Sequence, residues 1–588
     1  PRSARLTPQW GRGILGCTLS SFVGIILAAS SGCIREHENK AKIEVGVTPT
    51  ESPFAKSAAY RDTIGALTYY DGMGPMRVRG YGLVVGLGKN GSSDCPRPIY
   101  DRLVQSLYKH HRFSSSVVGV KNISPEQLIA DPDTAVVLVQ GEIPPAAVEG
   151  TRFDVGVMAV PGTQTKSLRG GRLFTADLEV FREVSPSASI SGQVLAMAAG
   201  PVFLNPFAEG DAATKSNPLE GIVVGGGFVV KDRRVRLVLT QPSYPKARQI
   251  QDRINSQFSG PTKVADALSP SFIQLHVPQE YHDDTGHFLS LVRSLYLTRD
   301  PAFEATRAAA LAEEIIHPAA PHAQISQCFE GLGRASLPKL NELYAHHKDY
   351  VSFHAAVAGM RLGDHVACDC LAMQAAKVDG EFRYPAIRAL AEAKGMGAAA
   401  VALRKLLHDS DPRVQIAAYE ALVKRDDPTI ESTPIAGDNF VLDHIPDAST
   451  NFIYVKRTGS RRIAMFGDKL QCSPPVLYRA PDGSVTINAA AGDEELTVLR
   501  SVVASGSMSP PIPAPRSLPP LIRLMGNEAG IASGGAATGL GLDYGAVVRA
   551  LYYLCQNHAV NAKFILEQPN AAELFGPAQL AGRPESEL

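Results

Sequence analysis

The chain has 588 residues, more than the roughly 250–300 residues at which a single hydrophobic core stops growing, so several domains are expected. Lys and Arg together number 58, as do Asp and Glu, so no net field favours nucleic acid or an acidic partner. The 52 glycines and 42 prolines indicate many turns between short elements.

Residues 1–36 have the pattern of an export signal. Three arginines precede an apolar run over residues 14–29, and small residues then lead to Cys33. Cys33 is the lipidation candidate, because a lipoprotein signal places its cysteine directly after small residues. Two other interpretations stay open: ordinary cleavage nearby, or an uncleaved anchor whose apolar run is short for a bilayer. The pattern predicts a periplasmic location, with a lipid anchor to the outer membrane as one variant.

A polar linker is expected over residues 37–59, and regular elements follow from residue 60. Apolar periodicity predicts strands near 64–70, 81–87, 135–139, 221–230, 235–239 and 273–277, and helices near 99–111, 247–255 and 285–297.

The stretch 149–174 is a strand, a basic loop and a second strand. Residues 153–159 alternate between apolar and other residues, and Pro161-Gly162 ends the strand. Another strand begins at Leu173. The stretch contains no nucleophile and no paired carboxylates, so it suits contact with a neighbour better than catalysis.

Three cations surround the glycine pair Gly170-Gly171 in this loop: Lys166, Arg169 and Arg172. They have two interpretations. They pair with acidic groups of a neighbouring subunit or with the cell-wall polymer, or they are the solvated end of a hairpin and contribute little to stability.

The string Gly86–Gly91 fits GxGxxG after a strand. A phosphate cradle needs a helix N-terminus at that point, and Pro96 and Pro98 argue against an immediate helix start. We therefore expect turn glycines here, and no cofactor.

Three blocks, 80–91, 133–178 and 193–300, resemble the bacterial flagellar P-ring protein family. The resemblance rests on Gly80-Tyr-Gly-Leu-Val-Val-Gly-Leu, Phe153-Asp-Val, Lys166-Ser-Leu-Arg-Gly-Gly, Gln193-Val-Leu-Ala-Met-Ala-Ala-Gly, and the run from Ala247 to Asn255. It implies a non-enzymatic, homo-oligomeric ring in the periplasm, around the flagellar rod at the peptidoglycan layer and partnered by the outer-membrane ring. The assembly-interface candidates are Lys166, Arg169, Gly170, Gly171, Arg172, Gly80, Gly82 and Gly86.

The P-ring-like region covers residues 60–300. In residues 301–428 the composition changes, and Ala, Leu and charged residues recur with the period of a helix. Helices are expected at 303–316, 337–346, 352–362, 386–393 and 398–407. The unit 406–424, in which Asp409 and Asp411 can cap a helix and Pro412 suits its first turn, resembles a HEAT repeat, and about three units of 40-odd residues would fit. Such an array implies a protein partner of unknown identity; the other interpretation is a plain helical insertion that packs on the body.

Strands return in a P-ring-like β region, 429–503, with a hairpin over 452–467 and a strand at 484–488. A proline-rich linker is expected at 504–519, and a helical segment at 520–588 with helices at 544–555 and 561–567. The predicted fold class is therefore α+β: mixed strand and helix domains of P-ring type, interrupted by a HEAT-like helical insertion.

The remaining residues give little evidence for a catalytic or metal-binding site. The six cysteines beyond Cys33 are expected to be core thiols or to form one disulfide. The segment 281–287 offers imidazoles and carboxylates, but a polar loop that caps the next helix explains it without a metal. No catalytic, metal or cofactor residue is assigned. A membrane-tethered envelope scaffold that binds partners through the HEAT-like surface, without a ring, is the alternative function.

Overall fold

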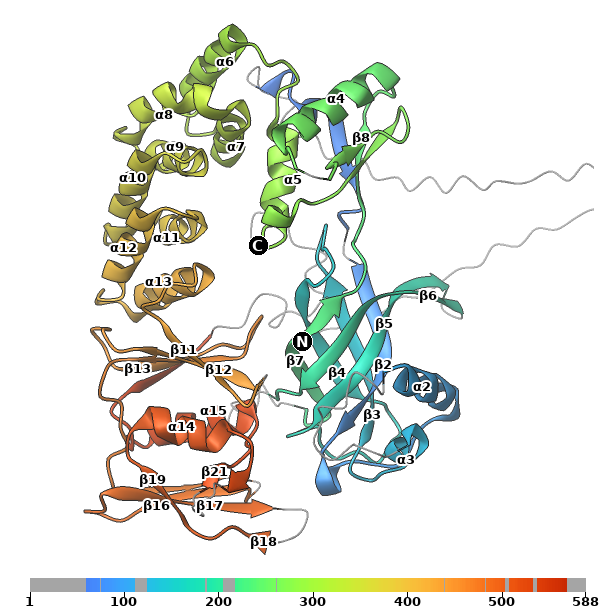
Figure 1. Ribbon diagram of the computed structural model, residues 1–588, viewed down its shortest axis with the longest axis vertical. Helices are drawn as coiled ribbons and strands as arrows, with labels where there is room; N and C mark the ends of the chain where they lie inside the picture. Colours follow the sequence, from blue (N-terminus) through green and yellow to red (C-terminus); the bar gives the residue numbers. More distant parts are fainter. Residues whose placement is uncertain are drawn as a thin grey trace, which may run out of the picture. The chain divides into compact units, whose positions relative to one another are not determined.

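The computed structural model describes residues 60–567, apart from 75, 111–123, 186–187, 205–216, 261, 438, 482, 503–506 and 532–536. Both helices and sheets are present, which confirms the α+β class (Figure 1). Among the described residues, no helix combines the length and apolarity needed to cross a membrane.

A closed six-stranded barrel forms the first body, in the order β2-β3-β4-β7-β6-β5. Its strands are β2 Met76–Val85, β3 Ala135–Ile143, β4 Arg152–Ala159, β5 Arg172–Ser185, β6 Ala188–Pro201 and β7 Glu220–Val229. Every second residue of β4, including Phe153, Val155 and Val157, is buried in the barrel core. Two helices, α2 (Arg97–His110) and α3 (Pro125–Ile129), pack with the other face of β2 and β3. The period-2 pattern thus predicted both the strand and its buried face correctly.

A second, smaller sheet has the strand order β1-β8-β10-β9. It consists of β1 Thr68–Asp71, β8 Val235–Leu239, β10 Phe272–Leu275 and β9 Ala265–Asp266, and its core includes residues of α4 (Tyr244–Gln257) and α5 (Thr285–Ser294). The strand expected over residues 64–70 is only half correct. Thr63 caps a short helix, α1 (Ile64–Leu67), because its side chain accepts the N–H of Ala66, and the strand begins afterwards.

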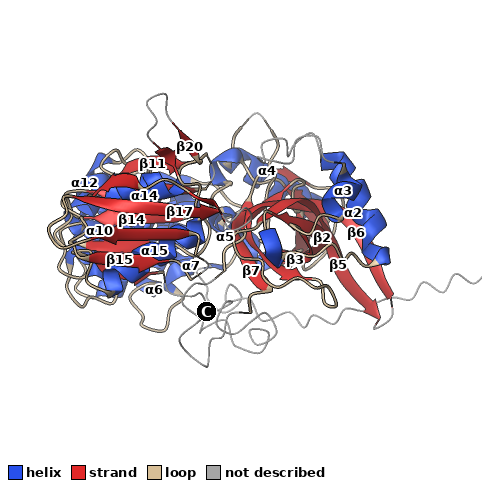
Figure 2. Cartoon of the chain, turned by 90° about the horizontal axis from the view of Figure 1, so that it is seen from below, coloured by secondary structure: helices blue, strands red, loops and turns tan. Residues whose placement is uncertain are grey.

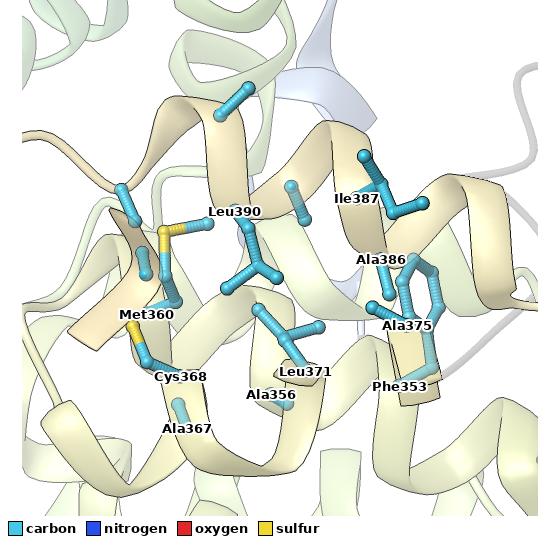
Figure 3. Close-up of a cluster of buried hydrophobic side chains, with 14 of the residues drawn as sticks. Phe353, Ala356, Met360, Ala367, Cys368, Leu371, Ala375, Ala386, Ile387 and Leu390 are labelled. Atoms are coloured by element: carbon cyan, nitrogen blue, oxygen red, sulfur yellow. The ribbon is translucent and has the colours of Figure 1, made fainter. Parts of the chain in front are cut away.

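The helical block comprises α6 (Pro301–Glu314), α7 (His322–Leu332), α8 (Leu337–Tyr344), α9 (Asp349–Arg361), α10 (His365–Ala376), α11 (Arg383–Glu392), α12 (Gly397–Leu406) and α13 (Pro412–Lys424). The helices form two layers, with α8, α10 and α12 in one and α7, α9, α11 and α13 in the other (Figure 1). Figure 3 shows the core between them, where Leu371 and Leu390 meet among alanines and Met360.

A ladder of alternating charge runs through the layer of α7, α9, α11 and α13. Glu330 lies 3.7 Å from Arg361, Arg361 lies 2.9 Å from Glu392, and Glu392 lies 3.9 Å from Lys424. The half-buried His287 of α5 lies 2.9 Å from Glu330 at the first rung. Successive rungs are 31, 31 and 32 residues apart. The repeat unit is therefore shorter than the 40-odd residues expected, and the described block holds four helix pairs instead of three.

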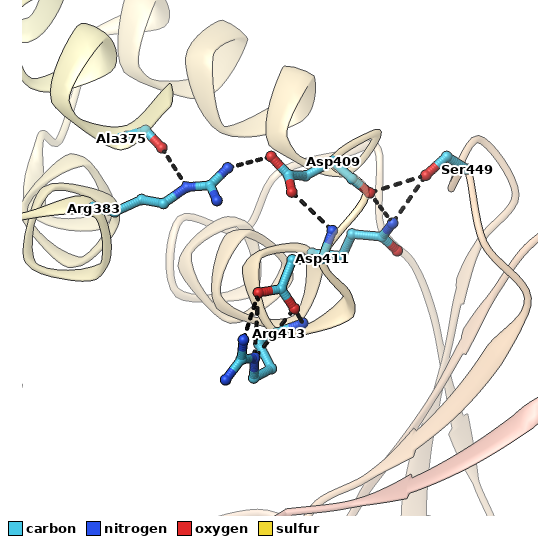
Figure 4. Close-up of polar contacts among 7 residues, drawn as sticks. Ala375, Arg383, Asp409, Asp411, Arg413 and Ser449 are labelled. Atoms are coloured by element: carbon cyan, nitrogen blue, oxygen red, sulfur yellow. Dashed lines mark hydrogen bonds and ion pairs between the residues drawn. The ribbon is translucent and has the colours of Figure 1, made fainter. Parts of the chain in front are cut away.

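The start of α13 confirms Asp411 as the cap, whereas Asp409, the other candidate, does not cap the helix. Asp411 accepts the N–H of Arg413 at 2.9 Å, and Pro412 occupies the first turn (Figure 4). In the same loop Asp409 binds the guanidinium of Arg383, whose Nε donates to the carbonyl of Ala375 at 3.1 Å. The loop is thus tied to the preceding repeat.

The last body has two sheets with helices between them. The first sheet has the order β11-β12-β14-β13-β22, from β11 Glu431–Ile435, β12 Phe440–Ile445, β14 Arg462–Phe466, β13 Phe452–Val455 and β22 Lys563–Leu566. The second contains β15 Val476–Arg479, β16 Val485–Ala489, β17 Glu495–Val502, β18 Ser507–Met508 and β19 Ile512–Pro515. Strands of both sheets and the helices α14 (Leu518–Gly526) and α15 (Tyr544–Gln556) share one core, and Figure 2 shows these strands in red and the helices in blue. A two-stranded ribbon, β20 Gly530–Ile531 with β21 Ala537–Gly539, completes the body.

The strands β13 and β14 are buried on both faces. Phe452 and Phe466 belong to the core of the helical block, whereas Ile453 and Met465 belong to the core with α14 and α15. These strands therefore join the helical block to the last body.

Two expectations near the C-terminus are wrong. Residues 512–515, inside the expected linker, form β19 and pair with β17, so the prolines occupy an edge strand. Residues 563–566, expected to be helical, form β22 parallel to β13, because that edge offers backbone partners that a short segment lacks on its own.

Candidate assembly interface

The basic loop between β4 and β5 does not end a hairpin. In the closed barrel β4 pairs with β3 and β7, whereas β5 pairs with β2 and β6, so the loop connects strands that are not neighbours. Leu168 is fully buried in the barrel core, and its N–H donates to the carbonyl of Pro218 at 2.8 Å. The hairpin interpretation is therefore wrong, and the loop is held against the barrel.

The structure brings this loop and the glycine string together. The N–H of Lys166 donates to the carbonyl of Asn90 at 2.8 Å. Gly86 has φ +79°, a turn conformation that glycine adopts without strain. Asp133 accepts the N–H of Gly88, so that backbone donor already has a partner within the chain, and burial raises the pKa of Asp133. The helix that follows begins only at Arg97, so the string is a turn.

The three cations of the loop differ in their exposure and in whether they already have partners within the chain. Lys166 is exposed, and within the described residues its ammonium group forms no ion pair. Lys89, on the neighbouring loop, is likewise exposed. Arg169 and Arg172 are half-buried and already have partners. Lys166 is thus the cation of the three that is best placed to meet another molecule.

The glycine candidates have packing explanations within the chain. A Cβ at Gly171 would lie 2.4 Å from Val84 Cγ1. One at Gly82 would lie 2.8 Å from a methyl group of Leu173, and one at Gly80 would lie 2.0 Å from the Asp177 carbonyl oxygen. Their geometry therefore explains Gly80, Gly82 and Gly171 as close approaches inside the barrel wall, whereas Gly170 is exposed with φ +72°.

One contact was not predicted from the sequence. The carboxylate of Asp154 accepts the N–H of Gly225 at 2.5 Å and that of Gly459 at 3.2 Å. Arg461 also donates to the carbonyl of Val224 at 3.1 Å. The bulge of β7 thus contacts the turn between β13 and β14. The signal in the sequence was Asp154 itself, an acidic residue within the alternating strand 153–159.

The remaining sequence candidates are placed as follows. Cys33 lies outside the described residues. The six described cysteines are free, five of them are buried, and burial raises the pKa of Cys370 to about 11, so they are core thiols. Asp284 caps α5 by accepting the N–H of His287, as the capping interpretation of 281–287 predicts. The described residues contain no cluster of three or more potential metal ligands.

The fold defines an α+β protein with a closed barrel, a smaller sheet, a helical block and a two-sheet body. A family model described as flagellar P-ring protein matches residues 63–305, and a HEAT-repeat model matches residues 374–433. The chain therefore combines the P-ring resemblance with the HEAT-like helical block, as predicted.

Curated relatives agree with this assignment. The flagellar P-ring protein of Nitrobacter hamburgensis is 30% identical over 272 residues, which is 44% of this chain and 67% of that protein. That of Geotalea uraniireducens is 30% identical over 243 residues, covering 39% and 60% of the two chains. That of Rhodopseudomonas palustris strain TIE-1 is 29% identical over 259 residues, covering 42% and 64%. The chain belongs to the flagellar P-ring protein family. Its match spans 60% of the length of the Geotalea protein and 64% of the length of the Rhodopseudomonas protein.

Proposed function

We propose that this chain is a structural component of the flagellar basal body and forms a P-ring-like ring in the periplasm, around the rod at the peptidoglycan layer. Membership of the P-ring family is the observation that carries the proposal. The rod, the outer-membrane ring and peptidoglycan are the proposed partners, and the helical block has a partner still to be identified.

The loop at the barrel end is the proposed assembly surface. Lys166 and Lys89 are exposed on adjacent loops whose backbones are hydrogen-bonded, so their charges are held close to a rigid barrel. A fixed basic surface of this kind suits an acidic surface of a neighbouring copy, because paired interface charges set orientation. Gly170 and the two arginines complete the loop.

The decisive experiment is imaging of basal bodies from cells that lack this protein. The expected result is loss of the P ring and of motility, and intact P rings would refute the proposal. Complementation with Lys166→Glu should restore fewer rings than complementation with Lys263→Glu, an exposed lysine in the loop before β9.

Family membership supports the ring over an envelope scaffold that forms no ring. Negative-stain images of the purified protein test this choice, because a persistent monomer would favour the scaffold. Labelling of cells with palmitate tests the proposed anchor at Cys33, and an unlabelled protein would remove it.

A further inference from the structure

Four bodies in the described part of the chain close into a circuit. The barrel is joined to the smaller sheet, that sheet to the helical block, the block to the last body, and the last body again to the barrel. The closing contact includes the hydrogen bond between Asp154 and Gly459, which are 305 residues apart in the chain. Two groups so distant in the chain stay in contact only if the bodies between them hold their positions.

The first junction, between the barrel and the smaller sheet, is fixed by a buried arginine. Arg233 lies between β7 and β8, and its guanidinium donates to the carbonyls of Ile143 at 2.7 Å and Gly72 at 2.8 Å. Ile143 ends β3 of the barrel, whereas Gly72 follows β1 of the smaller sheet. The chain also crosses this junction twice, between β1 and β2 and between β7 and β8. Covalent and hydrogen-bonded links therefore hold these two bodies together.

The second junction packs α7 of the helical block on α5. Arg253 of α4 donates to the carbonyl of Gly331 at 3.2 Å, and His287 lies 2.9 Å from Glu330. The approach is close, since a Cβ at Gly331 would lie 2.7 Å from the carbonyl oxygen of Ser294. The position of α7 on α5 is therefore closely defined at this end of the block.

One hydrophobic core continues from this junction through the helical block to the last body. It begins with Tyr60 and Tyr296, contains residues of every helix from α6 to α13, and ends with Phe452 and Phe466 on β13 and β14. Each helix pair packs on its neighbours, and a close-packed interior transmits a displacement at one end to the other. The block therefore fixes the distance between the smaller sheet and the last body.

The closing contact, between the last body and the barrel, is made by a turn and a bulge. No strand of the barrel pairs with a strand of the last body within the described part of the chain. Arg461 donates to the carbonyl of Val224 at 3.1 Å, and Val224 is buried in the core of the last body. A Cβ at Gly225 would lie 2.3 Å from the carbonyl oxygen of Gly459, so the two backbones touch. A contact of this kind tolerates little displacement of either body.

We propose that the helical block is a strut of fixed length that holds the last body against the barrel. Its two ends are built into the smaller sheet and the last body, so its four helix pairs set where the turn 456–461 lies relative to β7. A rigid connection keeps the turn at a high effective concentration beside the bulge, which a flexible connection of similar length would not do. This gives the block a task within its own chain, and the inference does not depend on the ring.

A longer block tests the strut on the purified full chain. A second copy of residues 364–425, inserted after Arg425, adds two helix pairs and keeps the alternation of the charge ladder. The last body should then be carried away from the barrel, and hydrogen exchange in the turn 456–461 should rise at least about tenfold. Addition of Asp154→Ala to the longer chain should cause no further rise, because Gly459 is no longer beside Asp154.

The strut is overturned if the longer chain folds and its turn 456–461 is as protected as in the wild type. Circular dichroism and the exchange of the barrel strands, which should both match the wild type, establish that the longer chain is folded.

A point variant decides the question if the longer chain does not fold. Gly331→Ala forces α7 away from α5, because the new methyl group would meet the carbonyl of Ser294, and the block carries this displacement to the turn 456–461. Exchange in the turn should rise at least about threefold, although the substitution lies at the opposite end of the block.

Gly397→Ala is the matched control for Gly331→Ala. It places the same methyl group at the start of α12, where nothing lies within 4 Å, so exchange in the turn 456–461 should keep the wild-type value. Equal exchange in the two variants overturns the strut.

Discussion

At the scale of single residues, Gly171 occupies a position in the barrel wall that leaves no room for a side chain. A Cβ there would lie 2.4 Å from Val84 Cγ1 and 2.5 Å from Leu87 Cδ2, which is closer than carbon atoms approach. Gly171→Ala should therefore destabilise the protein by about 1–3 kcal/mol, because the barrel wall must shift. Thermal unfolding measures this as a lower melting temperature.

Gly156→Ala is the control for this substitution. It lies on β4 of the same barrel, and its Cβ would meet nothing closer than 3.9 Å. Alanine there should be neutral or stabilise by up to about 1 kcal/mol, because it restricts the unfolded chain. Equal melting temperatures for the two variants would contradict the packing account of Gly171.

His354 makes the helical block sensitive to acid. Burial, reinforced by the nearby His322 ring at 5.5 Å, lowers the pKa of His354 to about 4. The unfolded chain then binds the proton more tightly, so stability is complete above about pH 6.5 and is lost as the pH falls towards 4. Between pH 7 and pH 5 this group should remove about 2 kcal/mol.

The test of His354 is the variant His354→Phe. Phenylalanine suits a site that already contains the rings of Phe353 and Phe382, and it cannot titrate. Its denaturant midpoint should fall less between pH 7 and pH 5 than that of the wild type. Parallel falls for both proteins would show that the acid sensitivity has another source.

At the scale of elements, the sequence predicted those that show one clear period. The alternation of residues 153–159 and the stripe of Ala247, Ile250 and Ile254 led to β4 and α4, because each buries one face only. It missed α10, whose apolar residues lie on both sides, and β22, whose strand conformation depends on the distant edge of β13. The local sequence pattern carries no information about partners that are distant in the chain. Glu567, for example, accepts the N–H of Arg457, which is 110 residues away.

The same limit applied to the candidate interface. The sequence and its family resemblance singled out Lys166 and the glycines, and the structure places Lys166 and Gly86 at one end of the barrel but Gly80 and Gly82 within its wall. It could not be foreseen that Leu168 would be buried between them or that the loop would join strands that do not pair, since barrel closure is a property of all six strands.

The junction between α13 and the strands β12 and β14 centres on Asp443. This carboxylate has no exposure, accepts the hydroxyls of Tyr419 and Ser432, and binds Arg462 at 2.7 Å. Asp443→Asn should cost about 3–5 kcal/mol, because it leaves the guanidinium without its acid. Tyr419→Phe, which removes one hydrogen bond to a charge, should cost about 1.5–3 kcal/mol. Denaturant midpoints that rank the two in the opposite order would refute this account.

At the scale of the whole molecule, Asp154 connects parts of the chain that are 305 residues apart. Asp154→Ala should release the backbone N–H groups of Gly225 and Gly459 and raise hydrogen exchange in the turn 456–461 roughly tenfold, as expected for a charged hydrogen bond of about 1.5–3 kcal/mol. Asp101→Ala, an exposed acid on α2, serves as the control and should leave exchange in that turn unchanged. Unaltered exchange in Asp154→Ala would show that Arg461 alone holds the contact.

The charge ladder limits how the helical block can change its length. Glu330, Arg361, Glu392 and Lys424 alternate in sign with one residue per helix pair. Deletion of the single pair α10 and α11 would remove Glu392 and bring Arg361 next to Lys424, two like charges in a half-buried layer. Gain or loss of two pairs preserves the alternation. Evolution can therefore insert or remove an even number of helix pairs within the ladder without changing any of these charges, whereas an odd step at an internal position requires a compensating charge reversal.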